Sequence, residues 1–365
     1  MAILNYGSLN SPVYGIIRNW EDQDYWYIVA TINKELIIPN EIIQSDTAIA
    51  VCTEYEAYDT IVEQIYNELV VECNISPKRI ILISENVDLT DIIKTTANKL
   101  NKDFINYEWS LVSQYTIRSQ TFNNKSSLTK IRPKTNSSNK YFLNFNRRWR
   151  IHRPTVVALL CALGLLDKGH VSLGPIEGMD NNWPTVIDNI TNFLKKDETL
   201  IELIKDHYEE IVNLKPMYLD TTILDVSRDR MYYNDIVPHK TIQLYKDTAF
   251  SLVSETHYFE NIGRYITEKT FKPISYHHPF IIINRPFSLK LLQDLGYKTF
   301  SPFIDESYDN EVDDIKRLHL IIKEVERLCK MNNDELDTFL KNIEPITEYN
   351  FIRLLTDVPN IYKKL

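Results

Sequence analysis

The sequence predicts an α/β protein made of two Rossmann-like domains. Three observations predict this fold class. Strand-length apolar runs alternate with helical stretches before residue 110, the alternation returns after residue 140, and a polar stretch separates the two halves. Such alternation is typical of parallel sheets that carry helices on their faces. A chain of 365 residues is long enough for two domains of ordinary size.

We place the first domain at residues 1–125, a linker or mobile loop at 126–140 and the second domain at 141–340. Residues 341–365 are expected to form a helix that packs back on the first domain. The boundary rests on the stretch 119–140, which is polar, contains no acidic residue and shows no hydrophobic period. A flexible basic arm that touches an acidic partner is the alternative role for this stretch.

Composition and charge exclude some classes of protein. The net charge of −9 argues against a surface that attracts nucleic acid everywhere, although it leaves room for a local basic groove. No apolar run approaches the roughly 18 residues that span a bilayer, and the first residues do not resemble a signal peptide. The four cysteines lie far apart, as free thiols in a reducing compartment do. We therefore expect a cytoplasmic protein (host cytoplasm if viral) with no membrane partner.

The first half reads as short β-type runs followed by three strands and two helices. The runs include 27–32, the strands are expected at 48–52, 79–83 and 104–107, and the helices at 58–73 and 90–100. Ligands of parallel sheets bind at the carboxyl ends of the strands. Glu54, Glu85 and Glu108 are expected just past strand ends and are candidates for that edge; the alternative is that they are solvated loop residues.

The second half opens with a strand at 141–145 that runs directly into four arginines and a histidine between Asn146 and Arg153. Pro154, at a first helical turn, then leads into an apolar helix at 156–166. The planar guanidinium group of arginine can donate two parallel hydrogen bonds to phosphate oxygens, which makes this junction a candidate anion site. The alternative is a surface cluster paired with some of the chain's many carboxylates.

The remaining elements are strands at 250–254 and 280–284, followed by an amphipathic helix at 312–329. Further helices are expected at 183–194, 200–214, 288–295 and from 334 to the end.

The block 259–279 concentrates polar residues at the start of a helix. Thr267 is expected to cap the helix, Glu268 lies in its first turn, and Lys269 adds a positive charge beside free backbone N–H groups. A helix N-terminus with a lysine binds anions, and a nearby carboxylate accepts sugar hydroxyls. This combination suits a nucleoside diphosphate with its ribose; the alternative is an exposed capped helix.

Two stretches carry a family resemblance. The block from FEN to YITEK resembles the donor-binding motif of the α1,3-fucosyltransferases, and FLNFNRRWRIHRPTVVALLCALGLLDKGHVSLG resembles that family's strand, arginine, helix and leucine-rich run. The segment 83–86, Ile-Ser-Glu-Asn, is similar to the family's short Gly-Glu-Asn segment. The runs TEKTFKPI, HPFIIIN and LGYKTFSPFIDESYD are also similar to glycosyltransferase-like proteins of tailed bacteriophages and some bacteria.

The resemblance implies a glycosyltransferase fold of the GT-B type, with a cleft between two Rossmann-like domains. The nucleotide-sugar donor would bind in the second domain, residues 141–340, and the acceptor in the first, so residues 1–125 are the acceptor-side domain.

It implies an inverting transfer in which Glu85 is the catalytic base. Metal independence is expected because Asp225 and Asp229 are spaced too loosely to form the Asp-x-Asp triplet that binds a divalent cation between phosphates. Arg153 and Lys269 would stabilise the leaving diphosphate. Glu268 would hold the ribose, and Tyr265 would line the pocket.

Arg150, Glu255 and Asn261 complete the expected donor site. The family spaces its asparagine six residues before the tyrosine, whereas Asn261 lies four before Tyr265, so Glu255 or Thr256 is the alternative for that place. A GDP- or UDP-sugar is the expected donor, with no cofactor beyond it and no metal.

The acceptor and the enzyme subclass stay open. A glycan, a small molecule and a hydroxymethylated base in duplex phage DNA are the three acceptor classes for this hexosyl- or pentosyltransferase. The phage-like motifs, the basic linker and three arginines (Arg147, Arg148 and Arg150) favour DNA, and the acidic net charge disfavours it. A non-catalytic nucleotide- or anion-binding module in an assembly and a nucleotide-processing hydrolase are the other two functions that fit.

Overall fold

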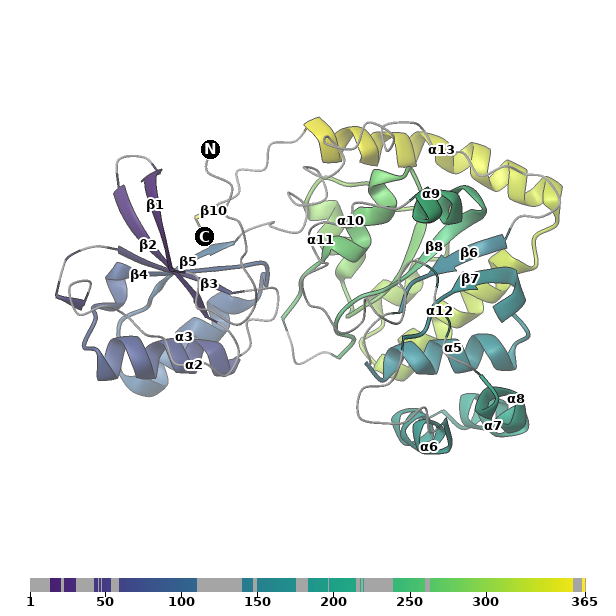
Figure 1. Cartoon of the computed structure of the whole chain (residues 1–365), viewed down its shortest axis with the longest axis horizontal. Coiled ribbons are helices and arrows are strands. Elements are labelled where there is room, and N and C mark those ends of the chain that lie inside the picture. Colours follow the sequence, from purple (N-terminus) through teal and green to yellow (C-terminus); the bar gives the residue numbers. More distant parts are fainter. Residues whose placement is uncertain are drawn as a thin grey trace. The chain divides into compact units, whose positions relative to one another are not determined.

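The computed structural model describes residues 14–20, 23–30, 43–44, 46, 48–53, 59–109, 140–146, 150–174, 183–195, 197–214, 217, 219, 239–259, 263–356 and 363–364. The chain divides into unit 1, with residues 1–112, 261–265 and 358–365, and unit 2, with residues 113–260 and 266–357. Each unit is α/β with parallel strands in its sheet, so the predicted fold class is confirmed (Figure 1). The predicted cleft stays a prediction, and residues 126–139 of the predicted linker lie outside the described residues.

Unit 1 contains a six-stranded sheet in the order β1-β2-β3-β4-β5-β10. The pairs from β2 to β5 are parallel, whereas β1 and β10 join the two edges antiparallel. The strands are β1 (Tyr14–Trp20), β2 (Gln23–Ala30), β3 (Ala48–Thr53), β4 (Ile80–Ser84), β5 (Asn106–Trp109) and β10 (Lys363–Lys364).

The helices of unit 1 bury an apolar stripe against this sheet. They are α2 (Asp59–Ile65), which continues as a π-helix (Tyr66–Glu72), a 3₁₀ turn (Pro77–Arg79) and α3 (Leu89–Leu100). Within the π-helix the side chains of Tyr66, Leu69 and Val70 are buried, and the Tyr66 hydroxyl accepts a hydrogen bond from the Ile105 amide at 3.0 Å. The single helix predicted at 58–73 is therefore an α-helix that widens into a π-helix.

Two expectations for unit 1 are wrong. Glu108 lies inside β5, opposite Ile83 and Lys364, rather than past a strand end. The helix predicted to run to residue 365 ends at Thr356, and Lys363–Lys364 form β10 on β5, because the edge of a sheet offers unpaired backbone groups to a further strand. Glu54 lies outside the described residues.

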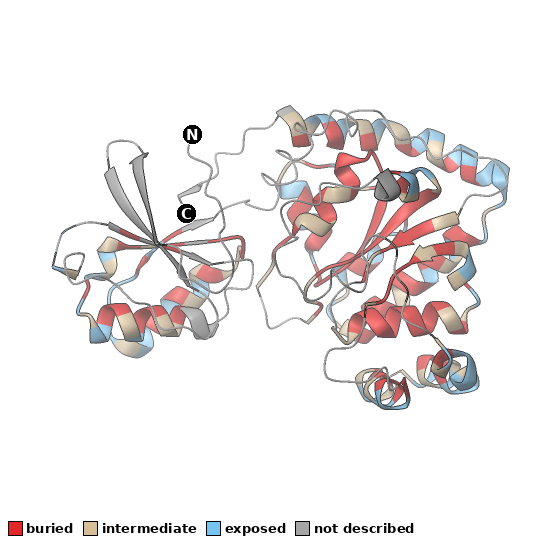
Figure 2. Cartoon of the chain, in the orientation of Figure 1, coloured by how far each residue is buried: buried red, intermediate tan, exposed pale blue. Residues whose placement is uncertain are grey.

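Unit 2 contains a four-stranded parallel sheet in the order β7-β6-β8-β9. The strands are β6 (Lys140–Asn144), β7 (Gly169–Val171), β8 (Thr248–Ser254) and β9 (Phe280–Ile283). Every residue of β8 and β9 is buried, as expected of parallel strands that are covered on both faces (Figure 2). The chain passes from β6 to β7 on one side and then places β8 on the other side of β6.

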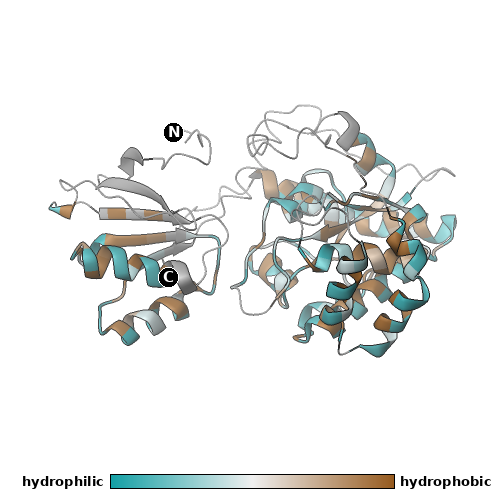
Figure 3. Ribbon diagram, turned by 60° about the horizontal axis from the view of Figure 1, so that its bottom comes forward, coloured by the Kyte–Doolittle hydropathy of each residue, from teal (hydrophilic) through white to brown (hydrophobic). Residues whose placement is uncertain are grey.

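Helices cover both faces of this sheet, with α5 and α12 on one face and α9, α10 and α13 on the other (Figure 1). Most helices carry both hydrophilic and hydrophobic residues, as amphipathic elements do (Figure 3). The described helices are α5 (His152–Ala162), α6 (Trp183–Phe193), α7 (Glu198–Asp206), α8 (Tyr208–Val212), α9 (His239–Lys246), α10 (Glu268–Ser275), α11 (Ser288–Asp294), α12 (Asp314–Cys329) and α13 (Asn333–Thr356), with 3₁₀ turns at Leu166–Lys168 and Ser307–Asn310.

The helix predicted at 200–214 is two helices. Asp197 caps α7 by accepting a hydrogen bond from the Leu200 amide at 3.0 Å. His207 interrupts the helix between α7 and α8, with φ −111° and ψ 25°. One ring nitrogen of His207 lies 3.0 Å from the Leu203 carbonyl, where it serves as the donor.

A short segment of unit 1, residues 263–265, packs against the carboxyl end of β4. Arg264 forms an ion pair with Asp88 at 2.9 Å and accepts a hydrogen bond from the Val87 amide at 3.0 Å. A Cβ on Gly263 would lie 1.7 Å from Oδ1 of Asn86, and Asn86 is fully buried. Glycine is therefore required at position 263 because no side chain fits there.

Replacing Gly263→Ala is expected to lower the free energy of unfolding by about 1–3 kcal/mol, because the Asn86 side chain has to move. Its movement breaks the 3.0 Å hydrogen bond from the Asp88 amide to Asn86 Oδ1. Urea unfolding measures the change. A double-mutant cycle with Asn86→Ala is the control: the two costs should be less than additive, and full additivity would place the strain elsewhere.

Candidate functional site

The candidate site lies where the carboxyl ends of β6 and β8 meet in unit 2. The chain leaves β6 for β7 on one side and for β8 on the other, which makes this edge a topological switch point. Ligands of open α/β sheets bind in the crevice outside such a point. The segment that follows β6 carries Arg150 and leads to α5, which begins with His152 and Arg153. Glu255 follows β8 directly. Helix α10 begins beside the same edge.

The Glu255 carboxylate joins the end of β8 to the start of α10. It is 0% exposed, and each of its oxygens accepts two hydrogen bonds. Oε1 accepts from the Thr267 amide at 3.2 Å and from the Thr270 hydroxyl at 2.6 Å. Oε2 accepts from the Thr267 hydroxyl at 2.6 Å and from the Thr256 amide at 3.3 Å. A buried carboxylate is tolerable here because its lone pairs are satisfied.

The Glu255 main-chain carbonyl joins the same strand to the start of α5. It accepts a hydrogen bond from an Arg153 guanidinium nitrogen at 3.1 Å and lies 3.0 Å from Nε2 of His152. Since a carbonyl only accepts, His152 carries its proton on Nε2. Burial and the charge of Arg153 lower the pKa of His152 well below its usual range, so the imidazole is neutral. Both side chains are almost fully buried.

Lys269 is held in the first turn of α10 by three oxygens. Its ammonium lies 2.9 Å from Glu268 Oε1, 3.1 Å from the Thr256 hydroxyl and 3.2 Å from the Thr267 hydroxyl. Burial acts to lower the pKa of Lys269, but the carboxylates of Glu268 and Glu255 outweigh it and the pKa is raised. Lys269 is therefore a charged cation in a fixed position at neutral pH.

Glu268 is also charged, and it has a spare acceptor. Burial acts to raise the pKa of Glu268, but the Lys269 ammonium outweighs it and the pKa is lowered. Oxygen Oε2 is buried and has no hydrogen-bond partner in the part of the chain that the structure describes. The predicted cap is confirmed, because the Thr267 hydroxyl accepts a hydrogen bond from the Lys269 amide at 3.4 Å.

The structure brings together four of the predicted site residues at this edge: Arg153, Glu255, Glu268 and Lys269. Arg150 is half-buried two residues before α5. Asn261, Arg147 and Arg148 lie outside the described residues.

Two predicted site residues belong to unit 1. Glu85 follows β4 and is 3% exposed, and Tyr265 is 2% exposed within the segment that packs against the end of β4. Their roles as base and pocket wall stay predictions.

Arg317 organises the same edge and was not anticipated. It projects from α12, is 1% exposed, and donates to the carbonyls of Asn284 at 3.0 Å and Tyr258 at 2.9 Å. Its guanidinium lies 4.5 Å from the centre of the Tyr258 ring, on which the His152 ring also stacks. An arginine among the apolar positions of an amphipathic helix was the only signal, and it does not say which distant residues the side chain reaches.

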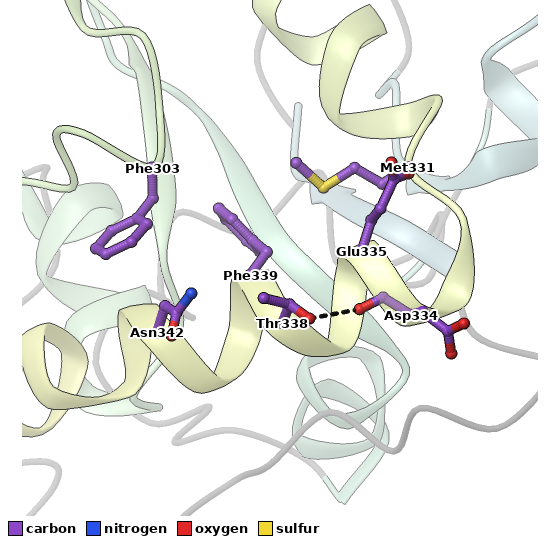
Figure 4. A pocket seen from close by; sticks show the side chains of 7 residues that line it. All are labelled: Phe303, Met331, Asp334, Glu335, Thr338, Phe339 and Asn342. Atoms are coloured by element: carbon purple, nitrogen blue, oxygen red, sulfur yellow. Dashed lines mark hydrogen bonds between the residues drawn. The ribbon is translucent and has the colours of Figure 1, made fainter.

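A pocket at the start of α13 lies away from this site (Figure 4). It is lined by Phe303, Met331, Asp334, Glu335, Thr338, Phe339 and Asn342. The Met331 carbonyl accepts a hydrogen bond from the Tyr141 hydroxyl at 2.5 Å, and Tyr141 lies near the amino end of β6. The pocket therefore lies by the opposite edge of the sheet, and we do not assign it to the candidate site.

Among the described residues, no three His, Cys, Asp or Glu side chains are grouped as metal ligands. The sequence does contain one Asp-x-Asp triplet, Asp22-Gln23-Asp24, a pattern that suits a divalent cation between phosphates, so the sequence argument for metal independence is wrong. Gln23 and Asp24 belong to β2, and Asp22 lies outside the described residues. Within the described part of the chain, no helix has the length and apolar character to cross a bilayer.

Comparisons with known proteins find similarity in fold only. No family model matches the chain, and no curated protein sequence matches it. A UDP-forming α,α-trehalose-phosphate synthase from Burkholderia xenovorans superposes with a TM-score of 0.39 at 11% identity, over 84% of this chain and 66% of that one. A trehalose-6-phosphate synthase superposes with a TM-score of 0.40 at 11% identity, over 88% and 69%. The chain thus spans about two thirds of either structure, and neither likeness decides its function.

Removing the Glu255 side chain is expected to destabilise unit 2. In Glu255→Ala the buried amide of Thr267 and the hydroxyls of Thr267 and Thr270 lose their acceptor, which costs about 1–3 kcal/mol for each unsatisfied group. Thermal and urea unfolding measure the loss. Glu202→Gln, at an exposed position on α7, is the control and should change stability by less than about 0.5 kcal/mol. Equal stability of the two variants would contradict the role of Glu255.

Proposed function

We propose that this protein is a glycosyltransferase that binds a nucleotide-sugar donor in unit 2. The observation that carries the proposal is the pair of cations at the switch point, Arg153 beside the start of α5 and Lys269 in the first turn of α10. Both are held by oxygens of the segment that follows β8. Helix N-termini with fixed cations bind diphosphates, because backbone N–H groups and positive charge meet there.

In this proposal, different residues bind the diphosphate and the ribose of the donor. Arg153 and Lys269 neutralise the diphosphate, which gains negative charge as it leaves. Glu268 Oε2, which is buried and unsatisfied in the described part of the chain, accepts a ribose hydroxyl. Glu255 uses both carboxylate oxygens on the protein itself, so its role is to position α10 rather than to contact the donor. Arg150 and Asn261 are secondary contacts in this proposal.

The proposed transfer is an inverting displacement. The acceptor oxygen attacks the anomeric carbon as the bond to the diphosphate oxygen breaks, and Glu85 takes the acceptor proton. Tyr265 lines the pocket. This part rests on the resemblance of the segment around Glu85 to the α1,3-fucosyltransferases. The cations take the place of a metal, the donor is a GDP- or UDP-sugar, and the acceptor is a glycan, a small molecule or a hydroxymethylated base of duplex phage DNA.

Donor binding is the first test. Thermal-shift and calorimetric titrations with GDP-, UDP-, ADP- and CMP-sugars should show one class that raises the melting temperature by mass action. Lys269→Ala should weaken binding about 10- to 100-fold, the loss of a hydrogen bond to a charged group. Lys290→Ala, an exposed lysine on α11, is the matched control. If Lys269→Ala binds the donor with unchanged affinity, the diphosphate does not bind at Lys269. If the affinity depends on added Mg²⁺, donor binding is not metal-independent.

Catalysis is tested separately, because a non-catalytic nucleotide-binding module is the second candidate. Release of nucleoside diphosphate is measured with oligosaccharides, small alcohols and hydroxymethylated duplex DNA as acceptors. Glu85→Gln should bind donor normally and lose transfer about 10²- to 10⁴-fold, the usual contribution of a general base. Glu72→Gln, an exposed carboxylate of unit 1, is the control. If Glu85→Gln transfers the sugar at the wild-type rate, Glu85 is not the catalytic base. If the wild-type protein binds the donor but transfers the sugar to none of the acceptors, the non-catalytic nucleotide-binding module is favoured.

A further inference from the structure

Asn146 lies at the switch point and is not used by the proposed donor contacts. It follows β6 by two residues and is 1% exposed. Its backbone extends the sheet, because its amide donates to the Ser172 hydroxyl at 3.0 Å and its carbonyl accepts from the Gly174 amide at 2.8 Å. The backbone of Asn146 is therefore anchored to the segment that follows β7.

A chain of two amides determines how the Asn146 side chain is oriented. Nδ2 of Asn144 donates to the Leu252 carbonyl at 2.6 Å and to the Ser254 hydroxyl at 3.2 Å. Because Leu252 offers only an acceptor, the other atom of the Asn144 amide, Oδ1, has to face Asn146. Asn146 then has to present Nδ2, and it does donate to Asn144 Oδ1. The network therefore determines which atom of the Asn146 amide is Nδ2 and which is Oδ1.

Oδ1 of Asn146 is left as a buried acceptor with no hydrogen-bond partner among the described residues. A buried polar atom without a partner costs free energy, and in native proteins such atoms cluster where a ligand or water completes the network. A carbonyl-type oxygen needs a hydrogen-bond donor. The diphosphate of a nucleotide-sugar is esterified at both ends and fully ionised at neutral pH, so it carries none, whereas sugar and ribose hydroxyls and base N–H groups do.

We propose that Asn146 is a ligand-contacting residue that accepts a hydrogen bond from a hydroxyl or N–H group of the donor, and not from its diphosphate. The inference rests on the proposed nucleotide-sugar function. It divides the switch point into two parts: the helix N-termini with Arg153 and Lys269 take the anion, and the end of β6 takes the neutral, hydroxyl-bearing part of the same molecule.

The experiment compares three ligand sets that differ in what they offer to Asn146. Calorimetric affinities are measured for inorganic pyrophosphate, for UDP and GDP, and for UDP-glucose and GDP-mannose. In Asn146→Ala the affinity for pyrophosphate should stay within about twofold of the wild type. The affinity for the nucleotide or the nucleotide-sugar should fall about five- to tenfold, the loss expected for one neutral hydrogen bond.

Ser172→Ala is the matched control, because it removes one hydrogen bond from the same strand end and leaves Oδ1 of Asn146 in place. In Ser172→Ala, the affinities for pyrophosphate, the nucleotides and the nucleotide-sugars should not change relative to one another. Asn146→Ser replaces the alanine variant if that variant does not fold, and the same selective loss is expected. An equal loss for pyrophosphate and nucleotide-sugar, or no loss at all, would overturn the inference while leaving the proposed function intact. A wild-type protein that binds none of these ligands would overturn both.

Discussion

The buried acidic residue at the end of β8, Glu255, is the interaction on which unit 2's site depends. Its carboxylate binds the threonines at the start of α10, and its carbonyl binds the first residues of α5. One residue therefore sets the position of two helix N-termini relative to the centre of the sheet. A charge in this place is expensive unless every lone pair is used, which explains why so many donors converge on it.

The same arrangement accounts for the electrostatics of the edge. Glu255 and Glu268 keep Lys269 charged although it is largely withdrawn from water, and the hydrogen bonds to Thr256 and Thr267 hold the ammonium in one position. Arg153 donates hydrogen bonds to the main-chain carbonyls of Ser254 and Glu255, which orient its guanidinium at the end of β8.

Local patterns predicted much of unit 2's framework. The alternation of apolar runs predicted β6, β8 and β9, and the polar block predicted α10 with its Thr267 cap, which the structure confirms. The end of the chain was misjudged, because β10 depends on a free edge of β5 rather than on any periodicity of its own. The widening of α2 into a π-helix was also missed, because apolar spacing does not distinguish the two helix types.

The sequence by itself determined the elements whose hydrogen bonds close within a few residues, such as the Thr267 cap over Lys269. It also determined the charged residues at the two strand ends and so the general location of the candidate site. Only the tertiary structure decided which residues meet there. Glu255 and Thr270, Asn144 and Leu252, and Arg317 and Tyr258 are far apart in sequence. The physical reason is that these contacts arise from the order of strands in the sheet, which a run of neighbouring residues does not encode.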